Sequence, residues 1–117
     1  MRGIRGATQV AANTIEAMEE AVVELCQEIE RRNEIGPPDI VWAIFTVTHD
    51  LDADFPARSA RLAGWSDVPM ICSREIPVPG SMPRVVRVLL HLDSPGSRNH
   101  VYLRGAQALR PDLHVKP

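Results

Sequence analysis

Four side chains of this sequence have the types and settings that small-molecule chemistry needs. Arg87 stands inside the apolar run 84–92, where a guanidinium is partly removed from water and is unfavourable unless it meets an anion. Arg5 precedes two small residues, where the backbone can approach a ligand closely. Glu75 follows a strand-like run, and Tyr102 is the only tyrosine. This set favours recognition of an anionic small molecule, with any catalysis by placed charge rather than by proton transfer.

Each of these residues also has an ordinary structural explanation. Arg87 could form a salt bridge to a neighbouring strand or face water at a sheet edge, and Arg5 could be an exposed terminal arginine. Glu75 could be a solvated loop carboxylate, and Tyr102 could be a half-buried packing residue. The pattern alone leaves these alternatives open.

The usual catalytic and metal-binding motifs do not occur. The sequence has no nucleophile elbow, phosphate-binding loop or dinucleotide fingerprint. Cys26 and Cys72 lie far apart without a zinc-ligand motif, and a disulfide is not expected in a reducing cytosol. The acidic run 50–54 resembles the start of a calcium loop, but its sixth position is Phe55 and its twelfth is Arg61. We therefore predict no metal and no cofactor.

Length and charge limit the remaining classes. The chain has 117 residues, enough for the single domain that we predict over 1–117, and a formal net charge of −2. A near-neutral charge argues against nucleic-acid binding, and no apolar run approaches the roughly 20 residues of a membrane span. The first residues lack the apolar stretch of a signal peptide, so the prediction is a cytoplasmic protein.

The elements that must position these residues begin with a strand and a long helix. The strand is expected at 2–8. The helix should start at Asn13 as N-cap, with Glu16 completing a variant capping box, and should end at 36–38. Its buried stripe would consist of Met18, Ala21, Val22, Leu25 and Ile29.

The rest of the chain is predicted to be mostly strands. Strands are expected at 40–48, 68–74, 84–92, 100–104 and 106–109, and a second helix at 56–63. The continuous apolarity of 40–48 is typical of a central strand covered on both faces. This order predicts an α+β fold with a mixed sheet of about five strands and two helices. Two helices cannot cover both faces of such a sheet, so we expect a homo-oligomer.

Alternation within 84–92 sets the direction of Arg87. It shares a face with Val85, Leu89 and His91, and the opposite face is wholly apolar. Because Arg87 points to the less apolar face of a buried strand, a ligand or a partner would bind on that face.

Several segments together resemble the monofunctional AroH-type chorismate mutase family, the trimeric Bacillus type. They include RGIRGAT at 2–8, DFPAR at 54–58, HVYL at 100–103 and LRPDL at 109–113. The resemblance covers essentially the whole chain. It implies an α+β protomer in a homotrimeric pseudo-barrel with active sites at the subunit interfaces. It also implies an isomerase, without cofactor, that converts chorismate to prephenate on the route to phenylalanine and tyrosine.

The resemblance also implies roles for individual residues. Arg87 matches the arginine that donates to the ether oxygen of the breaking bond, and Arg5 matches the one that binds a substrate carboxylate. Glu75 matches the group that holds the ring hydroxyl, near the positive charge that develops on the ring. These three would be the catalytic residues. The resemblance also places Tyr102 and the backbone at Cys72 in the pocket. An adjacent subunit would supply Phe55, Ala57 and Arg58. Arg61, Leu109 and Arg110 would lie at the pocket mouth.

The chain departs from the family pattern in a few places. Arg58 stands where a typical member has lysine, which changes hydrogen-bond geometry but keeps the charge. Met70 and Ile71 replace a smaller and partly polar pair, one residue is missing between Arg61 and Gly64, and the tail after 113 is short. These departures concern the detail of the pocket and the kinetics rather than the reaction class.

Two other functions remain as alternatives. One is a non-catalytic trimeric protein that binds a dicarboxylate, and the other is a hydrolase or deaminase with Glu75 as the base. A chorismate assay distinguishes the first alternative from the enzyme, because a binding protein saturates without conversion.

Overall fold

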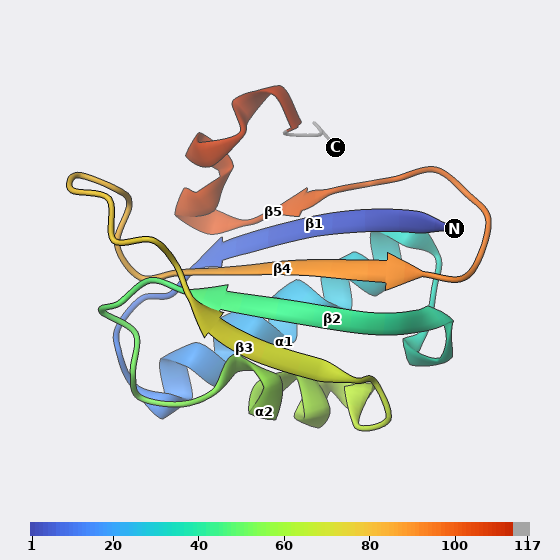
Figure 1. Cartoon of the computed structure of the whole chain (residues 1–117), viewed down its shortest axis with the longest axis horizontal. Coiled ribbons are helices and arrows are strands. Elements are labelled where there is room, and N and C mark those ends of the chain that lie inside the picture. The colour runs from blue at the N-terminus through green and yellow to red at the C-terminus, as the bar shows by residue number, and fades with distance from the viewer. Residues whose placement is uncertain (114–117) are drawn as a thin grey trace.

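The computed structural model describes residues 1–113, which form a five-stranded mixed sheet with helices packed against it (Figure 1). The order across the sheet is β3-β2-β4-β1-β5. β4 is antiparallel to both of its neighbours, whereas β2 with β3 and β1 with β5 are parallel. The predicted α+β class is confirmed. The strands are β1 (Arg2–Gln9), β2 (Ile40–Val47), β3 (Met70–Arg74), β4 (Val85–Leu92) and β5 (Val101–Tyr102).

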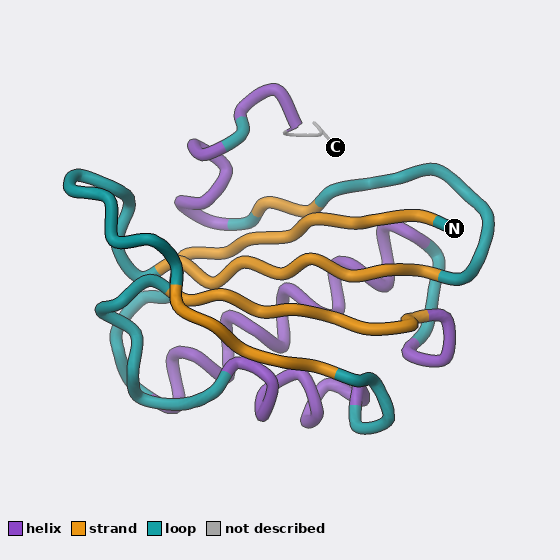
Figure 2. Tube along the Cα trace, viewed as in Figure 1, coloured by secondary structure: helices purple, strands orange, loops and turns teal. Residues whose placement is uncertain are grey.

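The two helices lie on the same face of the sheet (Figures 1 and 2). They are α1 (Ile15–Asn33) and α2 (Pro56–Ala60), and α2 continues into the π-helical turn η2 (Arg61–Trp65). Gly64 has φ 106°, a left-handed conformation that glycine adopts readily, so the second helical segment closes there as expected. No helix among the described residues is both long and apolar enough to cross a membrane.

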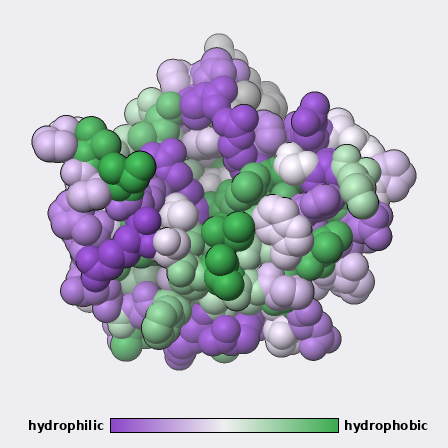
Figure 3. All heavy atoms as spheres, viewed as in Figure 1, coloured by the Kyte–Doolittle hydropathy of each residue, from purple (hydrophilic) through white to green (hydrophobic). Residues whose placement is uncertain are grey.

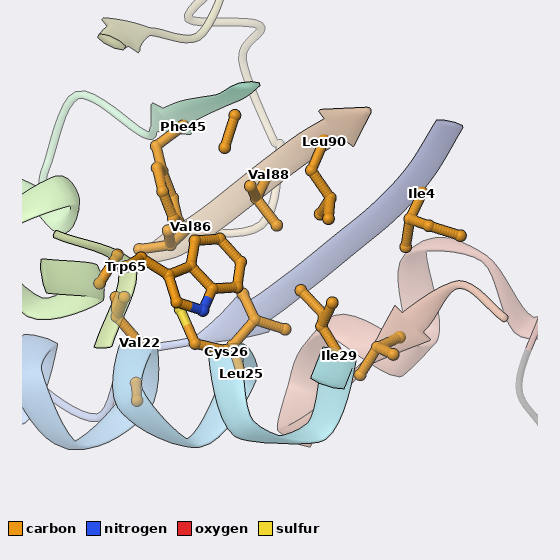
Figure 4. Close-up of a cluster of buried hydrophobic side chains, with 14 of the residues drawn as sticks. Ile4, Val22, Leu25, Cys26, Ile29, Phe45, Trp65, Val86, Val88 and Leu90 are labelled. Carbon is orange, nitrogen blue, oxygen red and sulfur yellow. The ribbon is translucent and has the colours of Figure 1, made fainter. Parts of the chain in front are cut away.

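The core lies between α1 and the sheet (Figure 4). The predicted stripe of α1 is fully buried, as is Trp65, whose ring lies 6.3 Å from that of Phe45. From the strands, Ile4, Val88 and Leu90 complete this cluster. Burying each such side chain contributes about 1.5–3 kcal/mol, so the apolar stripe of α1 accounts for its place on the sheet.

The start of α1 differs from the prediction by one residue. Thr14 is the N-cap, and its Oγ1 accepts a hydrogen bond from the backbone N–H of Ala17 at 3.1 Å. The side chain of Asn13 instead accepts from the backbone N–H groups of Asp52 and Ala53. Asn13 was therefore wrongly assigned, because its side chain serves a distant loop that the local sequence does not reveal.

Gly6 permits close packing of the helix on the sheet. A Cβ at this position would lie 3.0 Å from Val88 Cγ1 and 3.1 Å from Ile29 Cδ1. The sequence suggested that the small residues after Arg5 make room for a ligand. The structure shows that α1 fills the space on the core side of Gly6, and that Gly6 also lines a cleft of the sheet.

The other face of the sheet is open, as predicted from having only two helices (Figure 1). Burial alternates along β2, so the expectation that both faces of this strand are covered is wrong within one chain. Ile71 and Leu89 point to the open face and are 64% and 44% exposed. Hydrophobic side chains gather near the middle of this face, with hydrophilic ones around them (Figure 3).

The C-terminal part covers only one margin of the open face. Its 106–109 segment was predicted as a strand, but Arg104–Leu109 forms the 3-10 helix η3, and β5 has only two residues. Ala106 and Leu109 pack against Ala7 and Tyr102, and this packing favours a helical turn over another edge strand. The remaining short helices are η1 (Pro37–Asp39) and η4 (Pro111–Leu113). The short tail at 114–117 lies outside the described residues.

Candidate active site

A cleft lies on the open face, beside the segment that follows β5. Its volume is about 410 Å³. Strands β1, β2 and β4 contribute its floor, β5 contributes Tyr102, and the segment after η3 contributes Arg110. The lining residues are Arg5, Gly6, Ile44, Thr46, Arg87, Val88, Leu89, Tyr102 and Arg110.

Strand register brings the central residues of the cleft side by side. Arg87 on β4 pairs with Thr46 on β2 and with Ala7 on β1, and Ala7 pairs with Tyr102 on β5. Ala7, which is buried against Tyr102, Ala106 and Leu109, therefore lies between Arg87 and Tyr102 in this row. A second row, two residues along β4 and on the same face, holds Arg5 beside apolar neighbours, because Leu89 pairs with both Arg5 and Ile44.

Arg87 and Glu75 form an ion pair at the edge of the cleft. Arg87 Nε donates to Glu75 Oε2 at 2.9 Å, and Thr46 Oγ1 donates to the same oxygen at 2.8 Å. The backbone of Glu75 is fixed too, since its N–H donates to the carbonyl of Val47. The salt bridge that the sequence left as an alternative for Arg87 is therefore present, and it joins two of the predicted site residues.

The residue just before β4 is held by an acidic loop residue. Both carboxylate oxygens of Asp50 accept from the backbone N–H of Arg84, at 3.0 and 3.2 Å. Burial acts to raise the pKa of Asp50, but hydrogen bonds from Thr48 and the Arg84 backbone outweigh it, and the pKa is lowered. Arg84 has φ 52°, which is unusual for a residue with a side chain, so this anchor fixes the chain just before Arg87.

Positive charge dominates the opposite side of the cleft. The pKa of His100 is lowered from 6.5, first by burial and then by the guanidinium groups of Arg5, Arg98 and Arg110. Arg110 donates to Asp112 at 2.8 Å, and this hydrogen bond lowers the pKa of the Asp112 carboxyl. His100 Nδ1 accepts from the backbone N–H of Arg5 at 3.0 Å. A ligand in the cleft would therefore meet several cationic groups, a setting that suits an anion.

Other predicted site residues lie elsewhere in the chain. Phe55 and Cys72 line a second cavity of about 490 Å³, and Phe55 is 70% exposed. Ala57 is buried at the start of α2, while Arg58 pairs with Asp54 at 3.0 Å. Within one chain these residues are not part of the Arg5 and Arg87 cleft.

The two remaining predicted residues have separate settings. Arg61 is exposed at the first position of η2. Leu109 packs against the small cluster of Ala7, Tyr102 and Ala106, directly before Arg110 of the cleft.

Sequence reasoning gave no site role to Ile44, Thr46, Val88 and Leu89, which line the cleft, or to His100, which contacts Arg5. Ile44 and Thr46 were hidden because their strand was interpreted as covered on both faces. A hydroxyl at an outward position of a central strand was the available signal for Thr46. His100 opens the HVYL segment of the family resemblance, but nothing local indicated its contact with Arg5, which joins residues far apart in the sequence.

The described residues contain no cluster of three or more His, Cys, Asp or Glu side chains arranged to hold a metal ion. Cys26 and Cys72 are free, and burial, with a smaller effect of Glu30, raises the pKa of the Cys26 thiol. The groups that the cleft does present are fixed cations, one carboxylate and hydroxyl donors, which can bind and polarise an anionic molecule.

Comparison with known proteins gives one consistent result. The sequence model of the family described as chorismate mutase type I matches residues 1–113. The chain is 49% identical to chorismate mutase AroH of Thermus thermophilus, over 97% of this chain and 96% of that protein. It is 39% identical to chorismate mutase AroH of Bacillus subtilis (strain 168), over 98% and 94%. A solved chorismate mutase from Clostridium thermocellum superposes with a TM-score of 0.89 at 40% identity, covering 92% of this chain and 99% of that one.

Proposed function

The chain belongs to the chorismate mutase type I family and is an isomerase that converts chorismate to prephenate, and we propose that its active site is the cleft lined by Arg5, Arg87 and Tyr102. The convergence of guanidinium groups beside the Arg87–Glu75 pair is the observation that carries this assignment. The alternatives of a binding protein or a hydrolase lose their support, because the curated relatives are enzymes named for this rearrangement.

The reaction needs position and charge rather than a nucleophile. In one concerted step the ether C–O bond breaks, a C–C bond forms, and negative charge grows on the ether oxygen. Arg87 can donate to that oxygen from Nη1 or Nη2 while its Nε remains bonded to Glu75. A donor already held in place needs no reorganisation as the charge develops, and this is how such a group lowers the barrier.

The remaining cations suit the two carboxylates of chorismate. Arg5 lies one row from Arg87 across the floor of the cleft, and Arg110 and Tyr102 lie on its far side. Held at both carboxylates, chorismate would be restricted to the compact conformer that the rearrangement requires. Glu75 would accept from the ring hydroxyl and would face the positive charge that develops on the ring.

A homotrimer would complete this site. Phe55, Ala57 and Arg58 are away from the cleft in their own chain, so we infer that an adjacent copy supplies them across an interface. Two observations support this arrangement: the open sheet face exposes Ile71 and Leu89, and Phe55 is 70% exposed. Large exposed apolar side chains of this kind are typical of a surface that another protein covers.

The test is to break the assembly without touching the cleft. Ile71→Glu places a charge on the open face and should give a smaller assembly together with loss of chorismate turnover. Ile15→Glu is the matched control, since Ile15 is 46% exposed at the start of α1, on the other side of the sheet. Light scattering should give three times the 13.0 kDa chain mass for the wild type and the control. A dissociated Ile71→Glu protein with full turnover would exclude an interfacial site.

We also retain the proposals of a single domain over 1–117 and of a cytoplasmic location. The main core draws on α1, α2 and every strand, which supports a single domain. Cell fractionation followed by the chorismate assay would test the location.

A further inference from the structure

We propose that Thr46 is a positioning residue of this active site, acting through the carboxylate of Glu75. The inference rests on the proposed function, because it assigns a role to the group that holds Glu75 at the edge of the proposed cleft. Thr46 lies on β2, lines the cleft and pairs across the sheet with Arg87.

The contacts converge on one carboxylate oxygen. Thr46 Oγ1 donates to Glu75 Oε2 at 2.8 Å, and Arg87 Nε donates to the same atom at 2.9 Å. Among the residues that the structure describes, none donates a hydrogen bond to Glu75 Oε1. Two donors from two adjacent strands therefore fix Oε2, and Oε1 is left to accept from a substrate hydroxyl.

This arrangement also determines how Arg87 is used. A carboxylate free to rotate can take both oxygens to a guanidinium and form a bidentate pair. Such a pair would occupy two nitrogens of Arg87. By holding Oε2 from the β2 side, Thr46 keeps the pair to a single Nε contact, so that the terminal nitrogens stay available for the substrate.

Threonine suits this position for a physical reason. Its β-branched side chain has few χ1 rotamers in a strand, so the hydroxyl direction is set by the backbone of β2. β2 is an inner strand with neighbours on both sides. Glu75, in contrast, lies just beyond the end of the edge strand β3 and is followed by a proline-rich loop. The fixed strand thus holds the more freely placed carboxylate.

Thr46→Val tests this directly, because it removes the hydroxyl and keeps the shape. A hydrogen bond to a charged group is being lost at the reacting centre, and we expect kcat/KM with chorismate to fall by about ten-fold or more. Thr46→Ser should restore most of the rate. Thr8→Val is the matched control: Thr8 lies on β1 with its Oγ1 buried and without a hydrogen-bond partner in the described part of the chain, and its loss should leave turnover unchanged.

A double-mutant cycle separates positioning from structural support. In a Glu75→Ala background, Thr46→Val should have no further effect, since the carboxylate that it holds is gone. An equal loss in both backgrounds, or no loss in the wild-type background, overturns the role of Thr46 while leaving the proposed function intact. Full turnover by Glu75→Ala alone would instead overturn the proposed active site, and with it this inference.

Discussion

Replacement of Arg87 by alanine tests the proposed chemistry most sharply, because this side chain carries the charge that the breaking bond needs. Its Nε donates to Glu75 at 2.9 Å, so Nη1 and Nη2 are the groups left to donate to a substrate. Loss of one preorganised donor to a developing oxyanion lowers a rate by about 10²–10³. We expect kcat/KM with chorismate to fall by at least about a hundred-fold in Arg87→Ala.

The same substitution should have little effect on folding. The Arg87 side chain is 44% exposed and that of Glu75 is 18% exposed. An ion pair that is open to water contributes about 0–1 kcal/mol. The free energy of unfolding should therefore change by less than about 1 kcal/mol, and the loss of activity cannot then be attributed to unfolding.

Arg87→Lys separates charge from geometry. Lysine keeps the positive charge but offers one ammonium, which must serve either Glu75 or the ether oxygen. We expect it to recover only a small part of the rate that alanine loses. Citrulline at this position, which keeps the shape without the charge, should resemble alanine.

The assay follows the loss of the chorismate diene absorbance, with no metal or cofactor added. Urea unfolding and light scattering on the same samples establish that each variant is folded and assembled. If a folded and assembled Arg87→Ala protein turned over chorismate within about ten-fold of the wild-type rate, the assigned role of Arg87 would be refuted.

Two further predictions concern stability. The folded-state pKa of His100 is lowered from 6.5, so the fold favours the neutral imidazole. The resulting contribution to the free energy of unfolding is present above about pH 6.5 and is lost as the pH falls through the folded-state pKa. Urea unfolding at about pH 7.5 and about pH 5 should show that His100→Asn loses less of its free energy of unfolding in acid than the wild type does. Asparagine is chosen because its Oδ1 can still accept from the backbone N–H of Arg5. Equal losses in the two proteins would contradict the assignment. Thr14→Ala should lower the free energy of unfolding by about 1 kcal/mol with unchanged kcat/KM, because it removes the N-cap of α1. Thr14→Ser should be near wild type, and an unchanged stability in Thr14→Ala would show that the cap is unimportant.

Local patterns were sufficient for most of the elements. The stripe of α1 was visible because its apolar residues repeat with the helical period, and β2 and β4 were visible as long apolar runs rich in β-branched residues. Patterns failed where a distant partner decides the outcome. Asn13 bonds to a loop instead of capping α1, and the 106–109 segment packs over Ala7 and Tyr102 as a helical turn.

By itself, the sequence determined the family, the α+β class and the outward direction of Arg87, since these follow from motif order and strand alternation. Only the tertiary structure decided which strands are neighbours. The order β3-β2-β4-β1-β5 joins segments remote in the chain, and it alone brings Thr46 and Glu75 to Arg87. Strand pairing depends on backbone hydrogen bonds and on the packing of the whole core, and no short stretch of sequence encodes those.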